Sequence, residues 1–422
     1  MSLSRLSFVR GILILPSPMM LDDVEHQIQM HMGEAESMIR NLTRWTSVFV
    51  IIVMLAPQGP AQNAALRDLL DKLLVDGEIV AAQAVVGRGD DVLLNCAVGT
   101  TMPGGTQAVD ADTMFCIGSC SKPFASAVVM QMVEDGTLSL TVPIDTYMSA
   151  FGSLKIDGQG ASRAPTMSEV LSHRAGFYSQ KKKMTLQQLT YIRDFGLTLK
   201  ASVDGIAAQP LLAEPGTEYA YSGAGYCVAG RVAEVASEKS FEQLLQARLA
   251  GPLKLTRTTF FPEIAEPNIA AGGTLKNGNG TPNAATPHLT KPELRLPLIG
   301  GSLYSTAQDT ARFAMAVAGQ GRLGSIQIMT PNTWQKWTSR PYSDGGYGYG
   351  WGLLVRNRKT VQVSHTGALA ASRSSLYVNL EYGTYGVVHF TVVMGRPGGR
   401  STEPGGRINK ALGAAMRQMA QR

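Results

Sequence analysis

Segments with the pattern of β-strands lie near both ends of the chain and are scarce between them. After Tyr347, four runs rich in β-branched and aromatic residues are separated by glycine or polar turns: YGYGWGLLV, TVQVSH, SSLYVNL and YGVVHFTVVM. Residues 78–100, EIVAAQAVVGRGDDVLLNCAVGT, form the pattern of two further strands with a turn at Gly87 to Asp91. Two strands alone cannot bury their apolar faces, so the two ends must meet in one antiparallel sheet.

Helical patterns fill the rest of the chain. Residues 65–75 carry leucines at helical spacing, and PFASAVVMQMVEDG has no helix breaker between Pro123 and Gly136. Residues 137–295 are helical and loop-like, and GGRINKALGAAMRQMAQ closes the chain as a helix. The prediction is an α+β fold with helices flanking the sheet. A sheet lobe (about 62–136 and 296–422) carries an inserted, mainly helical lobe (about 137–295), and 422 residues that are 44% hydrophobic suffice for this core.

The first 61 residues have the pattern of a presequence. A short basic stretch at 38–44 precedes an apolar run at 45–56, and small residues at Gly59 and Ala61 follow. This order is typical of a secretory signal peptide over residues 38–61, and the run is shorter than the about twenty residues of a membrane span. We expect translation to begin at Met38 and the protein to be exported. The alternative is an uncleaved segment 45–56 that anchors the chain in the membrane.

Charge and cysteine content narrow the classes of partner. The net charge is +6, but only Lys181–Lys183 forms a basic run, which favours a solvated loop over a nucleic-acid surface. The four cysteines show no metal-binding spacing, and we expect buried thiols. No metal, cofactor or nucleic-acid partner is predicted, and the oligomeric state stays open.

Ser119 and Lys122 stand where an apolar run gives way to the predicted helix. A serine hydroxyl needs a neighbouring base to act as a nucleophile, and residues i and i+3 share one face of a helix. Burial lowers the pKa of a lysine, and a helix N-terminus favours developing negative charge. The spacing therefore predicts an acyl-transfer nucleophile. The alternative is a helix-capping serine and a surface lysine.

The Ser-x-x-Lys pattern is weak by itself, because Ser179 and Lys182 also match it. That second pair lies in a polar, lysine-rich stretch with no apolar helix after it, so we discard it. Gly-x-Ser-x-Gly, His-Glu-x-x-His and phosphate-loop motifs are absent from the sequence.

Five motifs in order resemble those of the serine β-lactamase and penicillin-binding-protein superfamily, in its class C β-lactamase-related branch of esterases, D-aminopeptidases and carboxypeptidases. FCIGSCSKPF resembles the nucleophile motif, VLSHRAGF a Leu-Leu-Ser/Thr-His landmark, and EPGTEYAYSGAGY the Tyr-x-Asn segment. GGSLYSTAQDTARF and SHTGALA resemble the two later landmarks. The resemblance begins at about Gly77 and extends to the end of the chain.

The resemblance implies roles for seven residues. Ser119 would be acylated, Lys122 would exchange its proton, and Tyr221 would help to pass that proton to the leaving group, as a phenolate or as a hydrogen-bonded partner of Lys122. His365, Thr366 and Gly367 would line the site in place of a Lys-Thr-Gly strand. The backbone N–H groups of Ser119 and Ala368 would form the oxyanion hole.

Several of these residues could instead have a purely structural role. Tyr221 could be an ordinary half-buried tyrosine and His365 a strand histidine satisfied by the backbone. His173 is expected to support the site rather than react, His389 to be structural, and Gly300 with Gly301 to allow a close backbone approach.

Two positions depart from the family pattern. Gly223 replaces the asparagine of Tyr-x-Asn, which removes an amide that would hold an acylamino group, and His365 replaces a cationic lysine. Both changes favour an esterase or D-peptidase that forms a Ser119 acyl-enzyme on a small-molecule or peptide ester, amide or lactam, and the signal-peptide pattern predicts that this enzyme is exported. The alternatives are a β-lactamase proper, or a penicillin-binding or sensor module without turnover.

Overall fold

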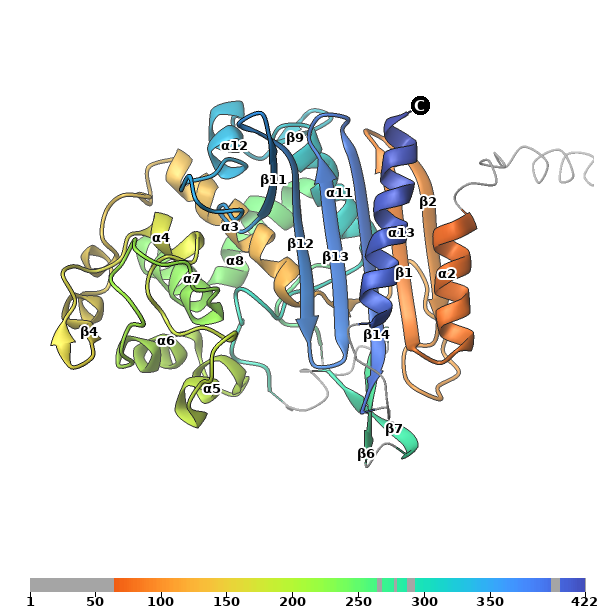
Figure 1. Ribbon diagram of the computed structural model, residues 1–422, viewed down its shortest axis with the longest axis horizontal. Helices are drawn as coiled ribbons and strands as arrows, with labels where there is room; N and C mark the ends of the chain where they lie inside the picture. The colour runs from red at the N-terminus through yellow and green to blue at the C-terminus, as the bar shows by residue number, and fades with distance from the viewer. Residues whose placement is uncertain (1–63, 264–267, 277–278, 287–292, 396–402, 422) are drawn as a thin grey trace, which may run out of the picture. The chain divides into compact units, whose positions relative to one another are not determined.

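The central sheet unites the two ends of the chain, which confirms the predicted fold class. The computed structural model describes residues 64–263, 268–276, 279–286, 293–395 and 403–421, and the predicted presequence 1–61 lies outside them. The principal strands are antiparallel to their neighbours and lie in the order β11, β12, β13, β14, β1, β2 (Figure 1). Their bounds are β1 Ile79–Arg88, β2 Asp91–Gly99, β11 Gly352–Arg356, β12 Lys359–Leu369, β13 Ser372–Asn379 and β14 Thr384–Met394.

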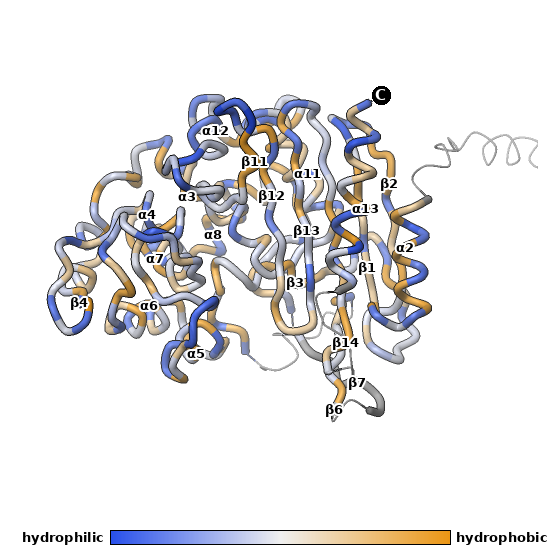
Figure 2. Tube along the Cα trace, viewed as in Figure 1, coloured by the Kyte–Doolittle hydropathy of each residue, from blue (hydrophilic) through white to orange (hydrophobic). Residues whose placement is uncertain are grey.

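One face of the sheet is covered by two helices from opposite ends of the sequence. Helices α2 (Ala64–Val75) and α13 (Glu403–Ala420) lie side by side on the viewer's side of β1 and β14 in Figure 1. Leu70 and Leu412 belong to the apolar cluster that these helices share with the sheet. Hydrophilic and hydrophobic residues alternate along both helices in Figure 2, as expected for helices with one buried face.

The opposite face of the sheet carries the larger core. Ala84 and Val86 of β1 belong to the α2–α13 cluster, whereas Val85 between them belongs to the other. This alternation follows from the two-residue period of a strand, and it explains why β1 is apolar throughout. Helices α3 (Ser121–Glu134) and α11 (Ala307–Ala318) contribute most of their length to the second core.

The inserted lobe is mainly helical, as predicted, and packs on α3. Helix α7 (Gly223–Ser237) contacts α3 and four other helices of the lobe. Those four are α4 Met167–Leu171, α5 Leu186–Arg193, α6 Leu199–Ala207 and α8 Phe241–Leu245, and α8 continues through a π-helical turn, Gln246–Ala250, into α9 Gly251–Leu253. Helix α12 (Pro331–Trp337) packs on α3 from outside this lobe.

One hairpin lies where the sequence predicts helices and loops. Strands β6 (Gly272–Lys276) and β7 (Asn279–Ala285) pair with each other, and β6 also runs parallel to the end of β14. A β-carbon on Gly272 would lie 2.3 Å from the β-carbon of Ala371, so glycine allows this close approach. Close packing against β14 overrides the weak strand propensity of the segments GGTLK and NGTPNAA.

The remaining elements are short. They are β3 Phe115–Cys116, β4 Lys155–Ile156, β5 Gln159–Gly160, β8 Tyr304–Ser305, β9 Arg322–Leu323 and β10 Ile326–Gln327, with 3-10 turns at Gly118–Cys120, Ile144–Thr146 and Ser149–Ser153. Among the described residues, no helix combines the length and the apolar character that crossing a membrane requires.

Candidate active site

Ser119 lies in a turn that precedes helix α3. Strand β3 leads into the 3-10 turn Gly118–Cys120 (η1), and α3 begins at Ser121, two residues before Pro123, which opens the predicted helix. The Ser121 hydroxyl donates a hydrogen bond of 2.6 Å to the Gly118 carbonyl and so closes the turn. Gly118 and Cys120 are buried, whereas Ser119 between them is partly exposed. The turn therefore presents the Ser119 side chain to solvent from a rigid base.

The turn η1 packs directly against β12. Gly118 has a positive φ of 53°, and a β-carbon there would lie 2.5 Å from the backbone nitrogen of Ala368. A β-carbon on Gly367 would lie 2.0 Å from the Ile117 carbonyl oxygen, which accepts a hydrogen bond of 2.5 Å from the Ser374 hydroxyl. These contacts place the segment His365–Ala368 beside Ser119, as the resemblance implies.

Lys122 is a buried amine held by one carbonyl. Its side chain is 1% exposed, and Nζ donates a hydrogen bond of 2.7 Å to the Gly300 carbonyl. Burial disfavours the charged ammonium and lowers the pKa of Lys122 to about 7, and the positive charge of Arg193 acts in the same direction. Near neutral pH a large share of Lys122 is therefore an uncharged amine that can accept a proton.

Tyr221 stands between the serine and the lysine. Its side chain forms a hydrogen bond with Ser119, and Nζ of Lys122 lies 4.7 Å from the centroid of its ring. Burial raises the pKa of Tyr221 to about 12, while the hydrogen bond to Ser119 opposes this shift. Tyr221 is thus a neutral phenol at neutral pH, and Lys122 is the stronger candidate for the resting base.

His173 fixes the backbone on both sides of Tyr221. Its carbonyl accepts a hydrogen bond of 2.8 Å from the N–H of Ala220, and its ring Nδ1 accepts one of 3.1 Å from the N–H of Ser222. The ring centroids of His173 and Tyr221 lie 4.4 Å apart. His173 has a positive φ of 62°, and burial holds its pKa well below the usual range. These contacts assign His173 a positioning role, consistent with the sequence-based expectation.

His365 is a neutral histidine whose tautomer follows from its partners. Nδ1 lies 2.7 Å from the Thr366 carbonyl, an acceptor, so Nδ1 carries the proton. Nε2 is then an acceptor, and the Tyr347 hydroxyl lies 2.9 Å from it as the donor. Burial, together with the charge of Lys122, lowers the pKa of His365 to about 3. His365 therefore does not supply the positive charge of the lysine that it replaces.

The structure brings the seven predicted site residues together around Ser119, and it adds residues that the sequence does not reveal. The side chains of Tyr226 and Tyr347 surround His173 and Tyr221, with ring centroids 5.3 and 4.7 Å from that of His173. Gln180 and Lys181 also border Tyr221 and Gly223. In the sequence, only the order of the landmark motifs suggests that Tyr226 and Tyr347 lie near the site. No sequence signal distinguishes Gln180 or Lys181.

The second Ser-x-x-Lys pair is not a nucleophile and base. The Ser179 hydroxyl donates a hydrogen bond of 2.6 Å to the Tyr221 carbonyl, and Ser179 is 3% exposed. Lys182 is exposed, whereas Lys122 is buried. Ser179 instead supports Tyr221, which justifies discarding the pair as a catalytic motif.

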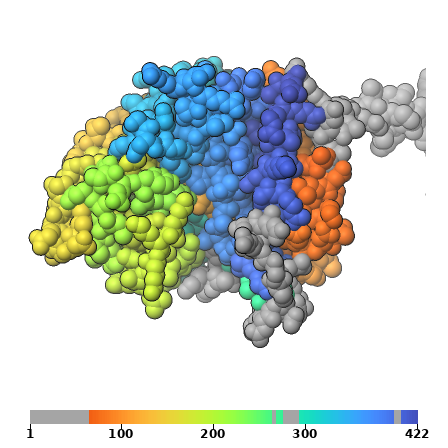
Figure 3. All heavy atoms as spheres, viewed as in Figure 1, coloured from red at the N-terminus to blue at the C-terminus, as the bar shows by residue number. Residues whose placement is uncertain are grey.

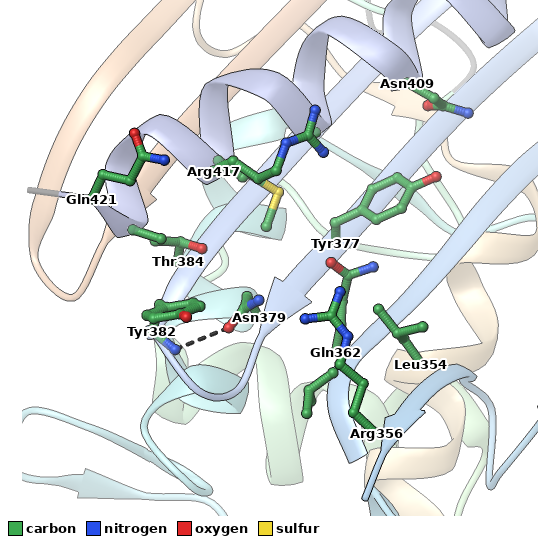
Figure 4. A pocket seen from close by; sticks show the side chains of 14 residues that line it. Leu354, Arg356, Gln362, Tyr377, Asn379, Tyr382, Thr384, Asn409, Arg417 and Gln421 are labelled. Atoms are coloured by element: carbon green, nitrogen blue, oxygen red, sulfur yellow. Dashed lines mark hydrogen bonds between the residues drawn. The ribbon is translucent and has the colours of Figure 1, made fainter. Parts of the chain in front are cut away.

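The site opens into a hollow beside the helical lobe. Figure 3 shows this hollow between the green residues of that lobe and the blue strands, with orange atoms of the segment that begins α3 at its floor. A separate cavity of about 510 Å³ lies between α13 and the outer face of β11 to β13, lined by Gln362, Tyr377, Asn409 and Arg417 among others (Figure 4). None of the seven predicted site residues lines that cavity.

The cysteines offer no competing nucleophile. All four are buried free thiols. Burial raises the pKa of Cys116 and Cys120 to about 12 and that of Cys227 to about 11, so they remain protonated at neutral pH. The part of the chain that the structure describes contains no group of three His, Cys, Asp or Glu side chains that could hold a metal ion.

Comparison with known proteins agrees with the resemblance. The family model named Beta-lactamase matches residues 66–403. Penicillin-binding protein 4 of Amycolatopsis lactamdurans is 27% identical over 307 residues, which cover 70% of this chain and 76% of the relative. Esterase EstB of Burkholderia gladioli is 24% identical over 277 residues, which cover 60% and 69%. The solved structure of EstCE1, a hydrolase with promiscuous acyltransferase activity, aligns with a TM-score of 0.69 and 20% identity over 83% of this chain and 98% of that one.

Proposed function

The chain belongs to the Beta-lactamase family, and on this premise we propose that it is a serine hydrolase that forms an acyl-enzyme at Ser119. The observation that carries the proposal is the arrangement around Tyr221. Its side chain forms a hydrogen bond with Ser119, and the buried amine of Lys122 lies over its ring. A partly exposed serine, a buried base with a pKa near 7 and a phenol are thus gathered at the start of α3.

The proposed reaction proceeds in two steps. The neutral amine of Lys122 accepts the Ser119 proton as Oγ attacks the substrate carbonyl, and the N–H groups of Ser119 and Ala368 bind the oxyanion that forms. The Tyr221 hydroxyl protonates the leaving group and recovers its proton from Lys122. Water then attacks the acyl-enzyme carbonyl, Lys122 accepts one of its protons, and this proton passes to Oγ of Ser119 as the bond between Oγ and the acyl carbon breaks. The products are a carboxylic acid and an alcohol or amine, and Ser119 is regenerated.

We propose an ester or a D-peptide as the substrate rather than a β-lactam that is turned over efficiently. His365 carries no positive charge, so β12 offers a weaker site for the carboxylate of a penicillin than a Lys-Thr-Gly strand would. The names of the relatives, an esterase and a penicillin-binding protein, are consistent with this class.

The test is turnover of aryl esters by the purified chain and by Ser119→Ala. We expect the variant to lose labelling by a fluorophosphonate and to lose turnover by about a thousandfold or more. A matched Ser121→Ala variant removes a neighbouring hydroxyl that hydrogen-bonds the Gly118 carbonyl and the Leu303 N–H, and it should keep the label. Undiminished ester turnover by Ser119→Ala would exclude the proposal.

Export is a separate proposal that rests on the pattern of residues 38–61. Mass spectrometry of the protein from its native host should find an N-terminus near Asn63. A mature chain that retains residues 45–56 would instead support a membrane anchor.

A catalytically idle penicillin-binding module is the alternative that Gly223 suggests. Many turnovers per molecule exclude it, whereas a burst of product without steady release supports it. The surroundings of Gly223 weigh against it, because another side chain fills the space that the missing asparagine would occupy.

A further inference from the structure

The cavity of about 510 Å³ behind the catalytic strand lies between a helix and the sheet. Helix α13 packs on β14 and β1, at one side of the sheet. From Asn409 onward α13 forms one wall of the cavity, and the outer face of β11 to β13 forms the other (Figure 4). Small-molecule sites commonly have volumes of about 300 to 1,000 Å³, so the size of this cavity suits a small ligand.

Side chains from three neighbouring strands line the sheet side of the cavity. Gln362 of β12 is paired with Leu354 of β11 and with Asn379 of β13, so these three residues lie in one row across the sheet. Tyr377 precedes Asn379 by two residues on β13 and therefore points to the same face. Tyr382, in the turn after β13, also lines the cavity. The sheet side thus offers amides and two aromatic rings to a ligand.

Two amides of the cavity wall have their oxygens engaged. Oδ1 of Asn379 accepts hydrogen bonds from the backbone N–H groups of Glu381 and Tyr382, at 3.0 and 2.9 Å. Oδ1 of Asn409 accepts one of 2.5 Å from the Ser375 hydroxyl. The remaining atom of each amide is Nδ2, which carries two N–H donors. Among the described residues neither Nδ2 has an acceptor, so both amides present donors to a ligand.

Two arginines bring positive charge to the same cavity. Arg417 of α13 and Arg356 of β11 line it, and their guanidinium groups lie above and below the Tyr377 ring in the view of Figure 4. Arg417 folds back along its helix, because a β-carbon on Gly413 would lie 3.4 Å from its Nη1. Both arginines are exposed, and neither forms an ion pair with another described residue. No Asp or Glu is among the described residues that line the cavity.

We propose that this cavity is a binding site for aromatic carboxylates, separate from Ser119. The ring of the ligand packs against Tyr377, and its carboxylate oxygens accept hydrogen bonds from the arginines. A guanidinium group holds a carboxylate through two parallel N–H donors, which makes arginine well suited to this ligand. Because the two guanidinium groups lie on opposite sides of Tyr377 in Figure 4, a ligand with a carboxylate at each end of its ring system engages both.

Three naphthalene probes test the class of ligand. Naphthalene-2-methanol carries no charge, 2-naphthoate carries one carboxylate, and naphthalene-2,6-dicarboxylate carries two. In isothermal titration calorimetry, we expect the dicarboxylate to bind about fivefold more tightly than 2-naphthoate, and 2-naphthoate about fivefold more tightly than the alcohol. Binding of both acids should weaken as salt is added. No detectable binding of the dicarboxylate, or equal binding of the alcohol, would overturn the inference.

Variants test whether the ligand binds in this cavity. Arg417→Met and Arg356→Met should each weaken binding of the dicarboxylate by about fivefold. Gly413→Leu keeps both arginines but puts a side chain into the cavity wall, and it should weaken binding by about tenfold. Leucine favours a helix more than glycine does, so this variant should fold. Lys410→Met is the matched control, because Lys410 is an exposed cation of α13 that does not line the cavity.

The control decides between a site and general attraction. Lys410→Met should leave the affinity unchanged, and an equal loss in this variant would mean that the ligand follows net charge, which would overturn the inference. Unchanged affinity in Arg417→Met, Arg356→Met and Gly413→Leu would do the same. Melting temperatures close to that of the parent show that the variants are folded.

The test must also separate the cavity from the catalytic site, because aromatic carboxylates resemble the acid products of the proposed hydrolase. Arg417→Met and Gly413→Leu should keep the parent's turnover of the ester phenyl butyrate while they lose affinity for the dicarboxylate. Ser119→Ala should bind the dicarboxylate as the parent does. If the dicarboxylate inhibits ester turnover competitively and its affinity is insensitive to Arg417→Met, it binds beside Ser119 and the inference is wrong. Binding that depends on Arg417 in a chain without ester turnover would support this inference and contradict the proposed function.

Discussion

The side-chain amine of Lys122 donates its hydrogen bond to the backbone carbonyl of Gly300 and not to a carboxylate. Nζ donates to the Gly300 oxygen at 2.7 Å, and a β-carbon on Gly300 would lie 2.9 Å from the same nitrogen, so glycine is required for this approach. Among the described residues, no Asp or Glu forms an ion pair with Lys122. A buried ammonium without a counter-ion is costly, which is why the pKa falls to about 7.

The first prediction concerns the pH dependence of turnover. Because the neutral amine is the base, kcat/KM for phenyl butyrate should rise with pH through a midpoint near the Lys122 pKa of about 7 and level off above it. Lys122→Met should lose turnover by about a hundredfold or more and lose this midpoint. Stopped-flow assays across pH 5.5 to 8.5 measure both, and a flat or falling profile would argue against Lys122 as the base.

The second prediction concerns stability. The pKa of Lys122 is about 7 in the folded chain and 10.5 for a free lysine, so between these values the unfolded chain binds more protons. The free energy of unfolding should therefore rise with pH in this window, by up to about 1.4 kcal/mol per pH unit. Lys122→Met lacks the titrating group, so its denaturant-derived stability should show a flatter dependence between pH 7 and 10. Equal slopes for the two proteins would contradict the buried, neutral amine.

The third prediction isolates the hydroxyl of Tyr221. Tyr221→Phe keeps the ring over Lys122 but removes the hydrogen bond to Ser119 and the proton for the leaving group. We expect kcat to fall by about a hundredfold or more, with a small change in KM and in melting temperature. Tyr219→Phe is the matched control, since Tyr219 packs on His173 from an exposed position. Similar kcat values for Tyr221→Phe and the parent would assign Tyr221 a purely structural role.

The sequence predicts the fold well where hydrophobic periodicity is strong. Strand β1 and the four C-terminal strands carry runs of apolar residues, and their shared sheet follows from the need to bury those faces. The β6–β7 hairpin was missed because its segments GGTLK and NGTPNAA have few β-branched residues and depend on packing against the end of β14. Tertiary contact rather than local propensity decides such a segment.

The candidate site was predictable to the extent that its residues lie in recognisable motifs. Ser119, Lys122 and Tyr221 were found by spacing and resemblance, and the structure brings them together. Gln180 was not found, because its relation to Gly223 is a steric exchange between segments 43 residues apart. The motif shows only that the asparagine is missing, whereas the structure shows that the Gln180 side chain takes its space.

The fourth prediction concerns acid stability and His389. This histidine is fully buried between β14 and α11, with Nε2 2.9 Å from the Thr310 hydroxyl. Burial lowers the pKa of His389 to about 3 from a usual 6.5. Between these values the unfolded chain binds more protons than the folded chain, so the free energy of unfolding is highest above pH 6.5 and decreases as the pH falls toward 3. The glutamine in His389→Gln cannot titrate. The free energy of unfolding of this variant should therefore fall less steeply in that window, with a slope that differs from the parent's by up to about 1.4 kcal/mol per pH unit. Urea titrations at pH 4 to 7 measure the two slopes, and identical slopes would mean that His389 is protonated in the folded chain.

The fifth prediction tests the contact between the nucleophile turn and β12 with two glycines of similar backbone conformation. Gly118 and Gly136 both have positive φ, 53° and 80°, but a β-carbon on Gly118 would lie 2.5 Å from the Ala368 nitrogen, whereas one on Gly136 would meet nothing within 4 Å. Both changes to alanine should cost about 1 kcal/mol of stability from backbone strain.

Only Gly118→Ala should separate Ser119 from the Ala368 N–H, and a displacement of about 1 Å there should lower kcat for phenyl butyrate by about a hundredfold. Gly136→Ala should keep the kcat of the parent in the fraction that is folded, as counted by circular dichroism. If both variants lose activity only in proportion to lost stability, the oxyanion hole does not depend on the approach of Gly118 to β12. If Gly118→Ala alone loses kcat, the close contact of the turn with the strand aligns the oxyanion donors.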